Sequence, residues 1–283
     1  MTKKLLTSFR VLIIILLVIL IGVGLYWFFV YYKNNTTSQQ LSEVVFEYAG
    51  NPINPDCLEK VVGMGFLESI NLSECSNDNY KYQSEDGWLL VDYGRDEDGG
   101  YYRGFFQYKV LGNIQDKIVI ASTENGGGTG YFDGIAMVKV SKNTLYLDRP
   151  IVYGDRCNGG IDFEKTKVED GILYYSQKMT PADVIDAIEL SQNPNGYNYP
   201  QLDSCTVCCT ALAKYKYSLL TGGEDLVSIT LYEEKFGNQS GQPKEKICFG
   251  QVYDSYIDFK KTELSLAELK NFDQKFLECL NSK

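Results

Sequence analysis

Residues 117–140 read KIVIASTENGGGTGYFDGIAMVKV. Two runs rich in β-branched and aromatic residues, 117–123 and 131–140, stand on either side of a glycine-rich segment. Runs of this composition, separated by residues that accept the positive φ angles of turns, are typical of antiparallel strands. The stretch therefore predicts two neighbouring strands, and the fold class depends on how often the pattern recurs.

The same pattern continues in both directions along the chain. We expect further strands at residues 88–93, 101–111, 144–153, 161–168 and 172–178, and again near 213–220, 226–233 and 249–259. Strands that follow one another with short turns predict a mainly β fold, arranged as an antiparallel meander, a sandwich or a barrel-like sheet.

A few helices interrupt this β pattern. Thr180 and Pro181 form a helix start signal, with Thr180 as the N-cap, and this helix should run to about residue 191. A C-terminal amphipathic helix is expected at about 265–280, with its apolar face packed on the sheet. That face consists of Leu266, Leu269, Phe272, Phe276 and Leu280. Residues 59–70 are ambiguous, since a short helix there would contain two glycines.

Three glycine-rich loops recur about every 30 residues. Residues 93–100 resemble residues 153–160, sixty positions later, and residues 124–130 lie between them. Two strands separate consecutive loops, and two antiparallel strands return the chain to its starting end. All three loops should therefore meet at one end of the sheet, where binding residues tend to gather.

These loops define a candidate ligand or partner site. Its members are Asp96, Asp98, Glu124, Asp133, Asp155, Arg156, Tyr93 and Tyr153. The simplest alternative is that the loops are hairpin turns and nothing more. Ca²⁺ is the one cofactor that their carboxylates suggest, although the spacing is not that of an EF-hand; otherwise we expect no cofactor. No Lys-Ser/Thr pair follows residues 126–130, so a phosphate-binding loop is excluded.

The eight cysteines all lie after residue 56. They are Cys57, Cys75, Cys157, Cys205, Cys208, Cys209, Cys248 and Cys279. An even number in a domain placed outside the cytoplasm predicts disulfides. We expect Cys57 to pair with Cys75, Cys248 with Cys279, and Cys157 with the 205–209 cluster. The C-x-x-C motif in that cluster leaves open a redox-active dithiol, and a four-cysteine zinc site would need a second such pair.

The N-terminus predicts a membrane anchor. Residues 11–32 carry no charge, which matches the length of a transmembrane helix, and aromatic residues crowd their far end. The alternative, a cleaved signal peptide, usually has a shorter apolar region and a small-residue cleavage site. Because the basic residues lie on the N-terminal side, residues 1–10 should be cytoplasmic. A polar stalk at 33–42 and an extracytoplasmic domain at 43–283 then follow, in a periplasm, at a cell surface or in a lumen.

Charge and composition narrow the function. Four of the 27 basic residues and none of the 37 acidic ones lie in the first 33 positions, so residues 34–283 carry a net formal charge of −14. Such a charge repels nucleic acid. The chain has no histidine and no Ser-x-x-Lys motif, which excludes the usual Ser-His-Asp, zincin and penicillin-binding chemistries.

These observations predict a single-pass membrane protein whose outer domain binds or scaffolds and does not catalyse. Its partners would be the lipid bilayer, through residues 11–32, and a protein or another envelope component. Two alternatives stay open. One is a thiol-disulfide oxidoreductase acting through Cys205 and Cys208, and the other is a carboxylate-based hydrolase of extracellular or envelope polysaccharide.

Overall fold

The computed structural model describes residues 46–63, 67–75, 82–95, 99–190, 199–237 and 240–282, all within the compact unit 45–283. This unit is mainly β, as expected, with antiparallel sheets, one of them curled into a half-barrel, and four helices in its described part. The expected anchor at 11–32, its flank at 1–10 and the stalk at 33–42 lie outside the described residues. Among the residues that are described, no helix combines the length and apolar character needed to span a bilayer.

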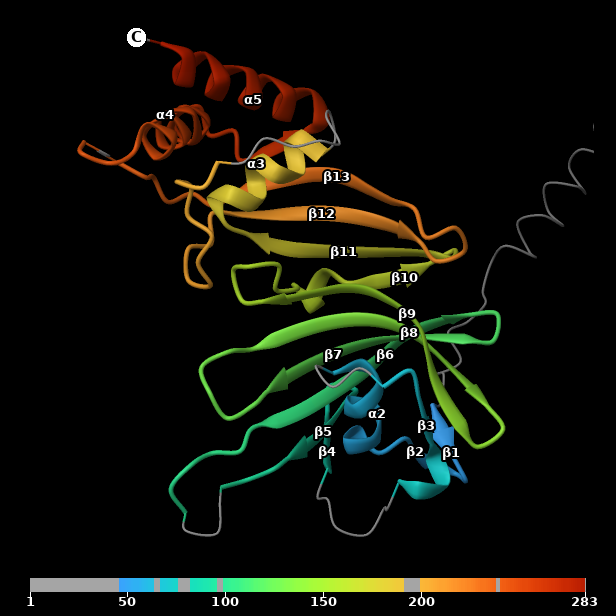
Figure 1. The fold of residues 1–283 in the computed structure, drawn as a ribbon. Coiled ribbons are helices and arrows are strands. Elements are labelled where there is room, and N and C mark those ends of the chain that lie inside the picture. The colour runs from blue at the N-terminus through green and yellow to red at the C-terminus, as the bar shows by residue number, and fades with distance from the viewer. Residues whose placement is uncertain are drawn as a thin grey trace, which may run out of the picture. The chain divides into compact units, whose positions relative to one another are not determined.

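A seven-stranded antiparallel sheet forms the half-barrel. Its strand order is β3-β9-β8-β7-β6-β5-β4, so six strands run as a simple meander and β3 adds to the far edge. In Figure 1 the sheet curls around helix α2. The strands are β3 (Ser69–Asn71), β4 (Tyr82–Glu85), β5 (Trp88–Asp92), β6 (Phe105–Ile114), β7 (Lys117–Asn125), β8 (Phe132–Ser141) and β9 (Thr144–Asp155).

Helix α2 (Pro55–Val62) fills the curl of this sheet. Asn54 caps the helix by accepting a hydrogen bond from the Asp56 N–H at 3.0 Å, and Pro55 begins the first turn. Leu58 and Val61 are fully buried against strand side chains. The helix considered at 59–70 therefore starts earlier and ends before Gly63, because its capping signal lies at residues 54–55. A short hairpin of β1 (Glu47–Tyr48) and β2 (Asn51–Pro52) precedes it.

The second sheet has five strands in the order β10-β11-β12-β13-β14. One face of this sheet packs against two different partners. At one end, side chains such as Leu173 and Tyr217 meet Val119 and Met137 of the half-barrel. At the other end, the face is covered by helices. The strands are β10 (Lys167–Glu169), β11 (Ile172–Met179), β12 (Ala211–Ser218), β13 (Glu224–Leu231) and β14 (Glu263–Ser265).

Helices α3 (Pro181–Leu190), α4 (Lys244–Asp258) and α5 (Leu266–Asn281) make up that helical layer (Figure 1). The starts of α3 and α5 were expected. Thr180 caps α3, and Ser265 forms a capping box with Glu268 at the start of α5. The α5 face packs as expected except for Leu266, which is 45% exposed.

The strand expected at 249–259 is wrong, because these residues belong to helix α4. Its buried side chains include Phe249, Val252, Tyr253 and Tyr256, which recur at helical spacings of three and four. The abundance of aromatic residues favours a strand, but their spacing of three and four residues is that of a helix.

Two other strand boundaries differ from expectation. The strand expected at 161–168 is mostly absent. Its middle forms the 3₁₀ turn η2 (Phe163–Lys165), and only residues 167 and 168 belong to a strand, β10. Strand β6 begins at Phe105, four residues later than expected, because residues 101–104 remain part of a glycine-rich loop.

All eight cysteines are paired. The disulfides join Cys57 to Cys75, Cys157 to Cys209, Cys205 to Cys208 and Cys248 to Cys279. The expected disulfides are confirmed, including the pairing of Cys157 with the 205–209 cluster.

Candidate functional site: a cleft at the loop end

The three glycine-rich loops lie together at one end of the half-barrel. Gly127 sits so close to the Tyr102 carbonyl that a Cβ would come within 2.0 Å of its oxygen. The third loop joins them because the Tyr131 N–H donates to Asp155 Oδ1 at 3.1 Å. Close backbone approaches of this kind require glycine, which explains why the loops share their composition.

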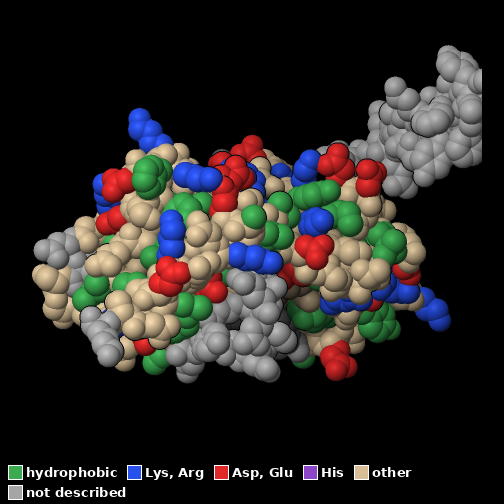
Figure 2. Space-filling model, turned by 90° about the horizontal axis from the view of Figure 1, so that it is seen from above, with side chains coloured by type: hydrophobic (Ala, Val, Ile, Leu, Met, Phe, Trp, Pro, Cys, Tyr) green, Lys and Arg blue, Asp and Glu red, His purple; other side chains and the backbone are tan. Residues whose placement is uncertain are grey.

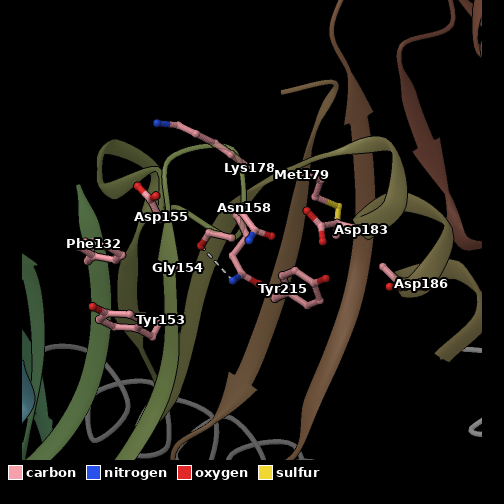
Figure 3. A pocket seen from close by; sticks show the side chains of 13 residues that line it. Phe132, Tyr153, Gly154, Asp155, Asn158, Lys178, Met179, Asp183, Asp186 and Tyr215 are labelled. Carbon is pink, nitrogen blue, oxygen red and sulfur yellow. Dashed lines mark hydrogen bonds between the residues drawn. The ribbon is translucent and has the colours of Figure 1, made fainter. Parts of the chain in front are cut away.

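An open cleft of about 530 Å³ lies beside these loops. The ends of β8 and β9 form one side, and β11, β12 and α3 form the other (Figure 3). Its volume is within the range of small-ligand pockets. Its aromatic lining residues are Phe132, Tyr153 and Tyr215, its acidic ones are Asp155, Asp183 and Asp186, and Asn158, Gln177 and Lys178 add polar groups.

Aromatic rings line both sides of the cleft, and each of them belongs to a stacked pair. Phe132 and Tyr153 stack with ring centroids 5.9 Å apart and an angle of 9° between their planes. On the other side, Tyr215 stacks on Tyr175 at 5.3 Å and 18°. Burial, followed by the negative charges of Glu224 and Asp183, raises the pKa of Tyr215, so this phenol stays neutral. The rings are thus held in place before any ligand arrives.

The carboxylates of the cleft have different surroundings. Asp155 forms an ion pair with Arg156 at 2.9 Å, and this guanidinium holds the pKa of the Asp155 carboxyl below its ordinary value. Asp183 Oδ2 accepts hydrogen bonds from the Thr180 N–H and hydroxyl at 2.9 and 2.8 Å. The Asp186 carboxylate forms no hydrogen bond and no ion pair with any other described residue. Burial, and then the charge of Asp183, raises the pKa of Asp186.

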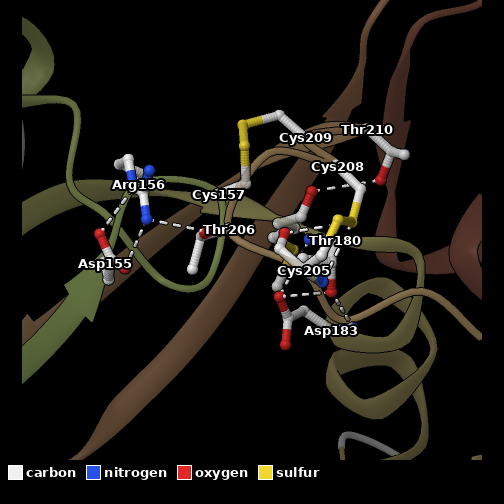
Figure 4. Close-up of a disulfide and its surroundings, with 11 residues drawn as sticks. Asp155, Arg156, Cys157, Thr180, Asp183, Cys205, Thr206, Cys208, Cys209 and Thr210 are labelled. Carbon is white, nitrogen blue, oxygen red and sulfur yellow. Dashed lines mark hydrogen bonds and ion pairs between the residues drawn. A yellow bond between two sulfur atoms is a disulfide. The ribbon is translucent and has the colours of Figure 1, made fainter. Parts of the chain in front are cut away.

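Two disulfides brace the rim of the cleft (Figure 4). The bridge from Cys157 to Cys209 ties the end of β9 to the segment that leads into β12. Arg156 strengthens the link by donating from Nη2 to Thr206 Oγ1 at 2.9 Å. The two sides of the cleft are therefore joined covalently, which limits how far they can separate.

Behind the Tyr153 wall, two glutamates meet under helix α2. The Tyr153 hydroxyl donates to Glu124 Oε1 at 2.8 Å, and the Tyr93 hydroxyl donates to Glu59. A Cβ on Gly63 would lie 2.6 Å from Glu124 Oε2 and 3.0 Å from Glu59 Cγ, so the glutamates approach each other beside this glycine. Burial, opposed by the Tyr93 hydrogen bond and reinforced by Glu124, raises the pKa of Glu59.

The residues proposed from the sequence thus separate into three places. Tyr153 and Asp155 line the cleft, with Arg156 at its rim. Tyr93 and Glu124 lie behind it, on the α2 side. Asp133 faces the 159–162 segment, where it accepts from the Ile161 N–H at 3.1 Å; burial raises its pKa. Asp96 and Asp98 lie outside the described residues.

Sequence reasoning missed the side of the cleft that comes from the second sheet. Asp183 and Asp186 lie one helical turn apart, on the same face of α3, and Tyr215 comes from β12. The i, i+3 spacing of the two aspartates was visible in the sequence. Nothing local, however, indicated that this face of α3 would lie opposite the loops.

Two further observations concern the surface charge and the capacity to bind a metal ion. On the face shown in Figure 2, acidic and basic side chains are interspersed, so the net negative charge forms no single patch there. The described residues contain no group of three or more Cys, Asp or Glu side chains placed to share a metal ion.

Comparison of the chain with protein-family models, curated proteins and solved structures found no match.

Proposed function

We propose that this protein is a single-pass membrane protein whose extracytoplasmic domain is a binding module that acts through the cleft at its loop end. The observation that carries the proposal is the cleft itself, with aromatic walls held by stacking and sides joined by the Cys157–Cys209 disulfide. Rigid walls lower the entropic cost of binding, since few side chains must be ordered when a ligand arrives. Residues 11–32 would hold this site at the membrane surface.

The site favours binding over thiol chemistry. Redox-active C-x-x-C motifs usually sit at a helix N-terminus, which stabilises the thiolate. The disulfide from Cys205 to Cys208 is instead followed by strand β12. The Cys157 N–H also bonds to the Thr206 carbonyl at 3.3 Å, which fastens this segment to the loop of the opposite side. This arrangement suits a structural brace.

Hydrolysis is the second candidate, and one observation favours it. The pKa of Asp155 is lowered and that of Asp186 is raised, and both carboxylates line the same cleft. Glycoside hydrolases use two carboxylates with such different environments. The Glu59–Glu124 pair suits this role less, because Glu124 is only 5% exposed and a polysaccharide could not reach it. Release of reducing sugars from polysaccharide, abolished by Asp186→Asn, would establish this candidate.

The binding proposal can be tested by photocrosslinking on the full chain in its own membrane. A photoreactive amino acid replaces Asn158, an exposed cleft residue, or, as control, Lys142 in the β8–β9 turn. We expect one discrete adduct from position 158 and none from position 142. Addition of Asp155→Asn together with Tyr153→Ala should abolish the adduct without lowering the amount of folded protein.

Two results would contradict the proposal. Equal crosslinking from both positions would show that the cleft is not a specific site. Absence of any adduct at position 158, with the protein correctly inserted, would show that the cleft binds no partner in that membrane.

A further inference from the structure

We infer that the cleft binds a cationic chain of the lysine type, with its ammonium group held by Asp183, Asp186 and Tyr215 on the α3 side. This inference rests on the proposed function and adds the ligand class. It is carried by the cavity, by its aromatic walls and by the sign of the charge on one of its sides.

The α3 side supplies two carboxylates and an aromatic ring. Asp183 accepts both of its hydrogen bonds at Oδ2, which leaves Oδ1 without a partner among the described residues. Asp186 lines the cleft one turn further along the same helix. In Figure 3 these two side chains lie on the same side of the cleft as Tyr215. Carboxylates and an aromatic ring together are what an ammonium group prefers.

The β9 side supplies a surface for an apolar stem. The stacked rings of Phe132 and Tyr153 form it, and Tyr153 is held from behind by its bond to Glu124. Donation to a carboxylate makes a phenol ring richer in electrons, which strengthens its attraction for a cation. Asn158 and Gln177 can accept or donate hydrogen bonds along a backbone that lies between the two sides.

An anionic ligand does not fit the same cleft. The positive end of α3 is already offset by Asp183, which lies in its first turn, and the Asp183 N–H bonds to Thr180 Oγ1 at 3.3 Å. Lys178 is the one basic residue among those lining the cleft, and in Figure 3 its side chain extends away from Tyr215. Arg156, at the rim, is neutralised by Asp155.

The test measures binding of defined probes to the full chain in a non-ionic detergent, by calorimetry at low salt. The probes are hexalysine, spermidine, hexaglutamate and cellohexaose. We expect hexalysine to bind, and its affinity to fall by about 3–10-fold in Asp186→Asn, since one carboxylate of a partly exposed ion pair is lost. The matched control is Asp225→Asn, which removes the same charge from an aspartate whose side chain is 73% exposed in β13, outside the cleft.

A second variant tests the aromatic wall. Phe132→Leu keeps an apolar side chain but removes one ring of the stack, and it should weaken hexalysine binding by about 2–5-fold. Thermal unfolding of each variant, recorded in parallel, separates loss of the ligand from loss of the fold.

The outcomes distinguish this inference from the proposed function. If spermidine binds as tightly as hexalysine, the result supports a cationic ligand and indicates that this ligand is a free polyamine. Binding of cellohexaose or hexaglutamate in place of the cations overturns the inference, while the cleft remains a binding site. Hexalysine binding that Asp186→Asn leaves unchanged also overturns it. The proposed function falls only on the photocrosslinking results, that is, if positions 158 and 142 crosslink equally or if position 158 captures nothing.

Discussion

At the scale of single residues, the most consequential arrangement is the pair of glutamates behind the cleft. Glu59 comes from α2 and Glu124 from the end of β7, and each receives a tyrosine hydroxyl. A negative charge on both at once is costly in a partly buried place, and protonation of one relieves that cost. Tyr153 connects this pair to the cleft, because its hydroxyl donates to Glu124 while the residue lines the cleft.

The titration of Glu59 makes a prediction about stability. Its folded pKa lies above its ordinary value of 4.5, with burial as the main cause, so the folded protein holds this proton more tightly than the unfolded chain. The free energy of unfolding should therefore fall as pH rises from about 4.5 through the raised value. Glu59→Gln should remove this loss and stabilise the protein at pH 7 by less than about 1 kcal/mol, since the group is partly solvated.

The measurement is a set of urea unfolding curves between pH 4 and pH 8. Glu47→Gln, at an exposed glutamate in β1, is the control and should leave the pH dependence unchanged. If Glu59→Gln changed stability by the same amount at every pH, the pKa of Glu59 would be equal in the folded and unfolded states, and the interpretation would be wrong.

At the scale of secondary-structure elements, α4 shows that the spacing of buried residues predicts the element better than the aromatic content of the segment does. In a strand, Phe249 and Phe259 would lie on the same face, because they are an even number of residues apart. In the helix they do not: Phe249 is 1% exposed and contacts Phe272 of α5, whereas Phe259, at the C-cap, is 82% exposed.

This difference gives a second prediction with a matched pair of variants. Phe249→Ala should lower the free energy of unfolding by about 3–5 kcal/mol, as is usual for a fully buried phenylalanine. Phe259→Ala should change it by less than about 0.5 kcal/mol. Denaturant unfolding monitored by circular dichroism measures both. Comparable losses in the two variants would favour the strand and contradict the helix.

At the scale of the whole molecule, the unit of residues 45–283 is held by two sheets that share a core and by four disulfides placed at separate points. The shared core includes Met137 of β8 and Leu173 of β11, both fully buried. The disulfides fasten α2 to the end of η1 (Leu72–Glu74), join the two sides of the cleft, close the 205–208 turn and link α4 to α5. Such a network is expected of a domain that folds in an oxidising compartment.

The third prediction follows from that network. Full-length protein, extracted under denaturing conditions with an alkylating reagent, should show no alkylated cysteine before reduction and eight after it. Mass spectrometry counts the added groups. Eight free thiols in the unreduced sample would contradict the extracytoplasmic location, and free Cys205 and Cys208 alone would instead favour the redox alternative.

Much of this fold could be predicted from residues close together in the sequence. Strands β5, β7, β8, β9 and β11 follow from their β-branched and aromatic composition, the start of α3 follows from its capping residue, and α5 follows from the spacing of its apolar residues. The pairing of Cys57 with Cys75 was readable because only 18 residues separate them. Each of these features depends on backbone preferences and contacts that span a few residues, which is why local patterns reveal them.

Only the tertiary structure decided which groups form the cleft. The meander could be expected to bring the glycine-rich loops to one end, but the position of the second sheet depends on a shared core whose residues are far apart in the chain. That packing sets Asp183, Asp186 and Tyr215 opposite Tyr153 and Asp155. It likewise places Glu59 beside Glu124, although 65 positions separate them in the sequence. Long-range burial, and no local preference, selects these neighbours, so a single sequence could suggest one wall of the site and not the other.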